Sequence, residues 1–228
     1  MAELISGLRA ETVRANLERV RAEIAAAERV PGAAAASRAE PAVEIVAATK
    51  YVPAHELPAL AEAGIRVVGE NRAQDLQAKV ELHGGLFEWD FIGRLQSRRV
   101  RLLVPHVRLI HSVASESALE QLARHRALAR EGLRVLIEVN VAGEPGKGGI
   151  APAQLDDFIA RSPLPVAGLM TMPPLTEDPS SSRPWFAALR ELARERGLEH
   201  LSMGTSQDYA VAVEEGATIV RIGTSLYR

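Results

Sequence analysis

Lys50 is the side chain in this sequence whose type and position best suit covalent chemistry. It closes an apolar run at residues 43–49, where a buried strand would end in a loop. Partial burial disfavours the ammonium form and leaves an amine that can form a Schiff base with a carbonyl carbon. The alternative is a solvated lysine at a strand end, since exposed lysines are common. The rest of the chain decides between these two interpretations.

Two short segments near the end of the sequence carry glycine and hydroxyl residues that suit a phosphate group. Backbone N–H groups beside such residues can close on phosphate oxygens. The alternative for the first segment is a helix cap, in which Thr205 and Asp208 satisfy each other without a ligand. The first segment contains Ser202, Gly204 and Ser206, and the second contains Gly223 and Thr224.

A lysine that can form a Schiff base and a phosphate site together describe pyridoxal 5′-phosphate, PLP. Arg221 is the candidate partner of the pyridine nitrogen of that cofactor. A guanidinium cannot accept the proton of this nitrogen, so it would disfavour the pyridinium and weaken the electron sink that carbanion chemistry needs. The alternative is an inward-facing arginine paired with a carboxylate such as Glu70.

The hydrophobic pattern predicts a fold that would bring these residues together. Eight short apolar segments alternate with helix-like stretches, which favours a closed (β/α)8 barrel of the TIM type. The polar and glycine-rich positions follow the C-terminal ends of these segments, and in a barrel those ends share one mouth, with phosphate often held after strands seven and eight. The predicted strands are residues 43–49, 66–69, 89–92, 109–113, 134–139, 166–170, 200–203 and 219–222.

A helix and a connector are predicted ahead of the barrel. Residues 4–29 show helical periodicity, with Leu8, Val13, Leu17, Val20 and Ile24 on one side. An alanine-rich connector then runs to residue 40. We expect one domain over residues 1–228, in which residues 1–40 are the helix and connector.

Composition narrows the classes of function. The 228 residues are 47% hydrophobic and 25% charged with a net charge of −2, so no basic field indicates nucleic acid. No segment resembles a membrane span or a signal peptide, and a cytoplasmic protein without a membrane partner is expected. The absence of cysteine excludes disulfides and thiolate catalysis, and the six histidines lack metal-ligand spacing.

Seven ordered motifs between residues 43 and 224 resemble the pyridoxal phosphate homeostasis protein family. No single motif would suffice, and their order makes the resemblance specific. They are Thr49-Lys50-Tyr51-Val52, Gly69-Glu70-Asn71-Arg72, Phe91-Ile92-Gly93 with Leu95-Gln96-Ser97, Val139-Asn140-Val141 with Glu144 and Lys147-Gly148-Gly149, Gly168-Leu169-Met170-Thr171-Met172, Leu201-Ser202-Met203-Gly204 with Ser206 and Asp208, and Val220-Arg221-Ile222-Gly223-Thr224.

The resemblance implies a PLP-loaded barrel without strong catalytic activity, which buffers or carries the cofactor or delivers it to PLP-dependent apoenzymes. The fold would be that of the N-terminal barrel of alanine racemase, PLP fold type III without the β-domain. Lys50 would carry PLP as an aldimine, Asn71 would lie near the ring and Arg221 near the pyridine nitrogen. The phosphate candidates are Ser202, Gly204, Ser206, Gly223 and Thr224, and Lys147 matches a family lysine proposed to act in cofactor handling.

The sequence departs from the family pattern at positions away from Lys50. Asp90 stands where the family usually has histidine, and Thr205 where it usually has methionine. Arg98-Arg99 replaces asparagine-lysine, and the ending at residues 226–228 replaces an aromatic-glycine pair. Asp90 is expected to change the polarity of the barrel interior, and Thr205 to add a phosphate contact.

Two other functions remain as alternatives. One is an amino acid racemase resembling alanine racemase, with Lys50 as one base; Tyr51, Tyr209 and Tyr227 have no sequence context that places a second base opposite it. The other is a barrel that binds a different phosphorylated metabolite without a covalent bond. A monomer is the simplest expectation for a barrel without an added domain.

Overall fold

A computed structural model, which describes residues 4–34 and 43–228, forms a closed eight-stranded barrel. All eight strand pairs are parallel, and β1 pairs with β8 to close the barrel. The strands are β1 (Glu44–Ala48), β2 (Val67–Glu70), β3 (Glu88–Phe91), β4 (Leu109–Val113), β5 (Arg134–Glu138), β6 (Val166–Met170), β7 (His200–Thr205) and β8 (Ile219–Ile222). The predicted barrel is therefore confirmed, with strand ends within two residues of those expected from the sequence.

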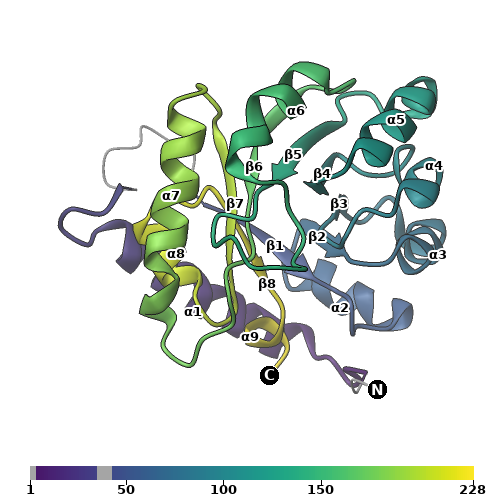
Figure 1. The fold of residues 1–228 in the computed structure, drawn as a ribbon. Helices are drawn as coiled ribbons and strands as arrows, with labels where there is room; N and C mark the ends of the chain where they lie inside the picture. Colours follow the sequence, from purple (N-terminus) through teal and green to yellow (C-terminus); the bar gives the residue numbers. More distant parts are fainter. Residues whose placement is uncertain (1–3, 35–42) are drawn as a thin grey trace.

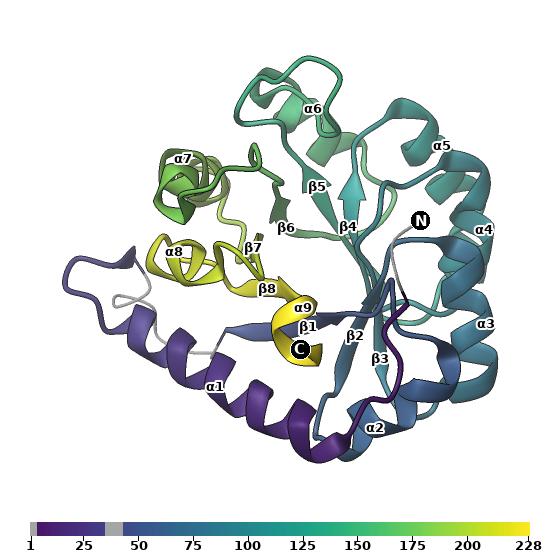
Figure 2. The ribbon, with the colours of Figure 1, turned by 90° about the horizontal axis from the view of Figure 1, so that it is seen from below.

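Helices form a ring around the barrel (Figure 1). Viewed from below, the amino-terminal helix lies on the outside of the barrel, between the helix that precedes β8 and the helix that precedes β2 (Figure 2). The α-helices are α1 (Ala10–Glu28), α2 (Leu57–Glu62), α3 (Ala73–His83), α4 (Val100–Leu103), α5 (Glu116–Arg124), α6 (Leu155–Arg161), α7 (Arg183–Arg194), α8 (Tyr209–Glu214) and α9 (Thr224–Tyr227). Short 3-10 helices are η2 (Ala54–Glu56), η3 (Ser97–Arg99), η4 (Arg126–Leu128), η5 (Pro152–Gln154) and η6 (Pro179–Ser182).

The amino-terminal helix is confirmed but starts six residues later than the periodicity predicted. Gly7 has a φ of +71°, which interrupts a right-handed helix. The amides of Gly7 and Leu8 donate to the Glu56 carboxylate at 2.6 and 2.9 Å, and the amide of Ile5 donates to the Tyr51 carbonyl at 2.8 Å. These long-range contacts hold the residues before α1 outside the helix. The predicted connector lies partly outside the described residues, since 35–40 are not among them.

Apolar side chains pack in two separate regions because successive residues of a strand point to opposite faces. The larger region lies between the strands and the helices, where α1 buries Val13, Leu17, Val20 and Ile24. The smaller region fills the barrel interior with Val46, Val67, Leu109, Leu136, Met170 and Ile219. Among the residues described, no helix is both long and apolar enough to cross a membrane.

Candidate functional site at the barrel mouth

Lys50 lies two residues beyond β1, where the strand opens into the mouth of the barrel. Its side chain is exposed, and Nζ lies 4.9 Å from the centroid of the Tyr51 ring. The preceding residue, Thr49, is fully buried. A buried anchor therefore holds the base of a loop whose amine is accessible to an incoming carbonyl compound.

The two predicted phosphate segments lie side by side in the structure. Ser206 Oγ accepts a hydrogen bond from the Gly223 amide at 3.0 Å, which joins the segment after β7 to the segment after β8. Gly204 has a φ of +89°, and a Cβ there would lie 2.6 Å from the Ala212 side chain. Only glycine fits at this approach. Thr224 is exposed and begins α9, so its amide has no partner within that helix.

The alternative interpretation of the first segment is partly realised. Asp208 Oδ1 accepts from the Thr205 amide at 2.8 Å and from the Thr205 hydroxyl at 3.1 Å. The amide and the hydroxyl of Thr205 therefore already have a hydrogen-bond acceptor within the protein. The phosphate contact expected from Thr205 would have to compete with Asp208. Ser202 lies deeper than the segment, fully buried in the barrel interior.

Arg221 projects from β8 into the barrel and is 5% exposed. Its Nη1 donates to Ser202 O at 2.8 Å and to Ser202 Oγ at 2.5 Å, and its Nη2 donates to the Thr171 carbonyl at 3.1 Å. Burial lowers the pKa of Arg221 to about 10, and the charges of Asp208 and Glu138 oppose this shift. Within residues 4–34 and 43–228, no carboxylate forms an ion pair with it, so a protonated guanidinium meets only uncharged groups directly.

The sequence-based alternative that Arg221 pairs with Glu70 is wrong. Glu70 points to the other side of the sheet, between the barrel and α3, where its carboxylate pairs with the buried ammonium of Lys79. Thr49 Oγ1 donates to Glu70 Oε1 at 2.6 Å, and Lys79 Nζ donates to the Thr49 carbonyl at 2.8 Å. The Arg221 and Glu70 side chains lie on opposite faces of the sheet, with β1 between their strands, so they cannot meet. The Glu70 cluster instead fixes the backbone that carries Lys50.

A line of buried polar side chains crosses the barrel interior below Arg221. Asp90 on β3, His111 on β4 and Ser202 on β7 are all fully buried and joined by hydrogen bonds. Desolvation lowers the pKa of His111; the hydrogen bond to Asp90 opposes the shift and the charges of Arg221 and Arg108 reinforce it. The sequence search missed His111, although a histidine at an inward position of an apolar strand was the signal that could have found it.

The remaining predicted residues lie at different parts of the mouth. Arg221 and Gly204 line a cavity of about 220 Å³, together with Lys147. Lys147 is paired with Glu144 at 2.6 Å and also lines a neighbouring cavity of about 560 Å³ that contains Glu138. Asn71 lines a separate cavity of about 70 Å³, and Lys50 lines none of these three. The structure thus places part of the first phosphate segment beside Arg221 in one cavity, which neither Lys50 nor Asn71 lines.

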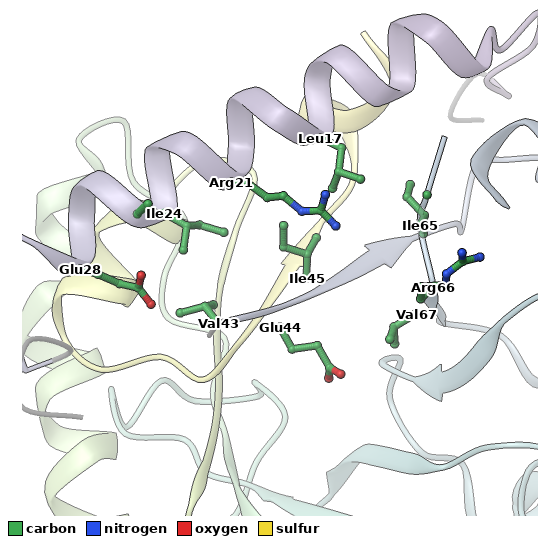
Figure 3. A pocket seen from close by; sticks show the side chains of 12 residues that line it. Leu17, Arg21, Ile24, Glu28, Val43, Glu44, Ile45, Ile65, Arg66 and Val67 are labelled. Carbon is green, nitrogen blue, oxygen red and sulfur yellow. The ribbon is translucent and has the colours of Figure 1, made fainter. Parts of the chain in front are cut away.

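A further cavity, of about 450 Å³, lies at the opposite end of the barrel. Figure 3 shows Leu17, Arg21, Ile24 and Glu28 projecting from α1 toward the start of β1. Its other walls are the first residues of β1 and β2, that is, the N-terminal strand ends. Chemistry in this kind of barrel occurs at the C-terminal ends, so the mouth is the candidate site.

Comparison with known proteins places the chain in a family. The model of the alanine racemase N-terminal domain family matches residues 33–228. The pyridoxal phosphate homeostasis protein of Aquifex aeolicus is 43% identical over 203 residues, covering 84% of this chain and 89% of the relative.

Two solved structures are similar to the chain over nearly their whole length. A protein of unknown function from Bifidobacterium adolescentis has a TM-score of 0.84 and 31% identity, covering 99% of this chain and 98% of that one. PipY of Synechococcus elongatus, solved with PLP bound, has a TM-score of 0.76 and 30% identity, covering 95% and 100%. The chain therefore belongs to the pyridoxal phosphate homeostasis protein family, whose barrel is that of the alanine racemase N-terminal domain.

Proposed function

We propose that this chain binds PLP as a Schiff base on Lys50 and acts in PLP homeostasis by storing, carrying and delivering the cofactor. The observation that carries the proposal is the state of Arg221, a buried cation at the mouth that, among the described residues, contacts only uncharged groups directly. The guanidinium could donate a further hydrogen bond to a nitrogen lone pair or to an anion. The pyridine nitrogen of PLP is such an acceptor, and the PLP-bound PipY relative supports this identity.

The residues at the mouth fit the three parts of PLP. The accessible Lys50 amine suits the aldehyde, Arg221 suits the ring nitrogen, and the joined loops at Ser206 and Gly223 suit the phosphate. In the bond-forming step, Lys50 Nζ as the free amine adds to the aldehyde carbon, and water leaves as C=N replaces C=O. When bound, PLP supplies an electrophilic aldehyde and an electron sink.

The proposed phosphate contacts differ in kind. We assign the direct contacts to Ser206, Gly223 and Thr224 because these residues lie where the two loops meet. Gly204 acts by keeping the approach free of a side chain. Ser202 acts through Arg221, since its hydroxyl contacts the Arg221 guanidinium. Asn71 remains a candidate neighbour of the ring.

The positions of the tyrosines favour a carrier over a racemase. The Tyr209 hydroxyl hydrogen-bonds to Glu23 on α1, and Tyr227 is the buried last residue of α9. Tyr51 lies against Lys50 itself. None of these three places a phenol across the mouth from Lys50 as a second base, which two-base racemisation needs. We therefore propose a carrier without strong catalysis. As separate proposals, the protein is a cytoplasmic monomer and hands PLP to apoenzymes.

The test is to titrate the purified protein with PLP, record its visible spectrum, reduce it with borohydride and map the pyridoxyl group by mass spectrometry. The chain has three lysines, Lys50, Lys79 and Lys147, so the modified peptide identifies which of them carries the pyridoxyl group. We expect the group on Lys50, and loss of both visible band and adduct in Lys50→Ala. An adduct on Lys147 alone, or protein that stays colourless, would contradict the proposal.

A further inference from the structure

For a neutral His111, the buried line beneath Arg221 has one consistent arrangement of hydrogen-bond donors and acceptors. Arg108 donates to Asp90 through Nε at 2.9 Å and Nη2 at 3.0 Å, so the carboxylate must accept. His111 Nε2 lies 3.1 Å from Asp90 Oδ2 and therefore carries a proton. The hydrogen-bond partners thus assign the Nε2–H tautomer to the neutral imidazole.

The assignment continues through Ser202 to Arg221. His111 Nδ1, which carries no proton in this tautomer, lies 2.8 Å from Ser202 Oγ and must accept the hydroxyl proton. The lone pairs of Ser202 Oγ are then free to accept from Arg221 Nη1 at 2.5 Å. In this arrangement every hydrogen bond from Asp90 to Arg221 has one donor and one acceptor.

We infer that Asp90 and His111 are positioning residues, which fix the polarity of the Ser202 hydroxyl and through it hold Arg221 for the ring nitrogen of PLP. The inference rests on the proposed function and concerns residues that do not touch the cofactor. Asp90 supplies the carboxylate that selects the tautomer.

The first experiment reads the tautomer without cofactor. Protein labelled with ¹⁵N-histidine is examined by long-range ¹H–¹⁵N correlation NMR, and His111 is assigned by its loss in His111→Asn. We expect the Nε2–H form in the wild type. In Asp90→Asn, the amide N–H can donate to His111 Nε2, which would shift His111 toward the Nδ1–H form. A wild-type His111 that is protonated on Nδ1 would overturn the inference.

The second experiment reads the consequence for PLP. We expect Asp90→Asn and Ser202→Ala each to raise the dissociation constant for PLP by about tenfold and to shift the visible band. Ser112→Ala is the matched control, because Ser112 is a buried β4 hydroxyl that bonds to the Gly93 carbonyl outside the line. Its affinity and band should equal those of the wild type.

The outcomes separate this inference from the proposed function. If the wild type binds PLP but Asp90→Asn and Ser202→Ala match it in affinity and band, the inference is wrong. If the wild type binds no PLP, the proposed function fails, while the tautomer measurement still tests the line itself. Should Asp90→Asn fail to fold by circular dichroism, Ser202→Ala decides, since Arg221 there retains its bond to the Ser202 carbonyl.

Discussion

Two buried cations stand on opposite sides of the sheet and are satisfied in different ways. Lys79, on the helix side, pairs with the Glu70 carboxylate and also donates to the Thr49 carbonyl. Arg221, on the interior side, donates only to uncharged groups within the part of the chain that the structure describes. Burying a charge without an opposite charge is costly. We propose that the protein bears this cost at the mouth of the barrel because Arg221 binds a ligand there, whereas the Lys79 pair is structural.

The largest effect is expected from removing the carboxylate of the structural pair. Glu70→Gln leaves the Lys79 ammonium buried without a counter-charge and should lower the free energy of unfolding by about 3–5 kcal/mol. Urea denaturation measures it. Glu81→Gln, at an exposed position of α3, is the control and should change the unfolding free energy by less than about 0.5 kcal/mol. A similarly small effect of Glu70→Gln would mean that the pair does not hold the fold.

Arg221→Met should affect stability only slightly and PLP binding strongly, whereas Glu70→Gln should mainly affect stability. Removing a buried charge that has no carboxylate partner should change the unfolding free energy by only about 1 kcal/mol, because the loss of hydrogen bonds offsets the relief of desolvation. The dissociation constant for PLP should rise by about 10–100-fold. The measurement is a spectroscopic PLP titration beside urea denaturation, with Arg101→Met on α4 as the exposed control. Unchanged PLP affinity would remove Arg221 from the site.

Replacing both partners of the structural pair separates the effect of the ion pair from the effect of leaving one charge buried alone. The double variant Glu70→Leu, Lys79→Met leaves no buried charge behind, so its unfolding free energy should fall by less than about 2 kcal/mol, which is less than for Glu70→Gln alone. The residual loss reflects the two hydrogen bonds that join Thr49 to Glu70 and to Lys79, which the double variant removes. If the double variant is less stable than Glu70→Gln, the Lys79 side chain stabilises the fold by more than its ion pair with Glu70 accounts for.

The smallest effect concerns pH. The folded-state pKa of His111 lies below the unfolded value of 6.5, mainly because of desolvation. The unfolded state therefore binds the proton first, so stability is complete above pH 6.5 and is lost as pH falls below it toward the folded pKa. His111→Asn should lose less stability than the wild type between pH 7.5 and pH 5, measured by urea denaturation at each pH. His55→Asn, at an exposed site, should retain the wild-type pH dependence.

The sequence predicted the elements better than the contacts between them. The eight strands were predictable because each is a short apolar run that alternates with a helical pattern. The start of α1 was not, since the Gly7 turn depends on Glu56, nearly fifty residues away. The position of Glu70 could have been predicted from strand alternation, but the inward and outward faces of β2 depend on where the strand begins. The line from Asp90 to Ser202 joins three strands and has no signature within one segment.

The most direct test of the central claim is the ¹⁵N NMR shift of the ring nitrogen in labelled PLP bound to the protein. The account predicts an unprotonated nitrogen at neutral pH in the wild type and a different shift in Arg221→Met. A protonated nitrogen, or the same shift in both proteins, would contradict the claim that Arg221 is left without a carboxylate in order to meet the cofactor.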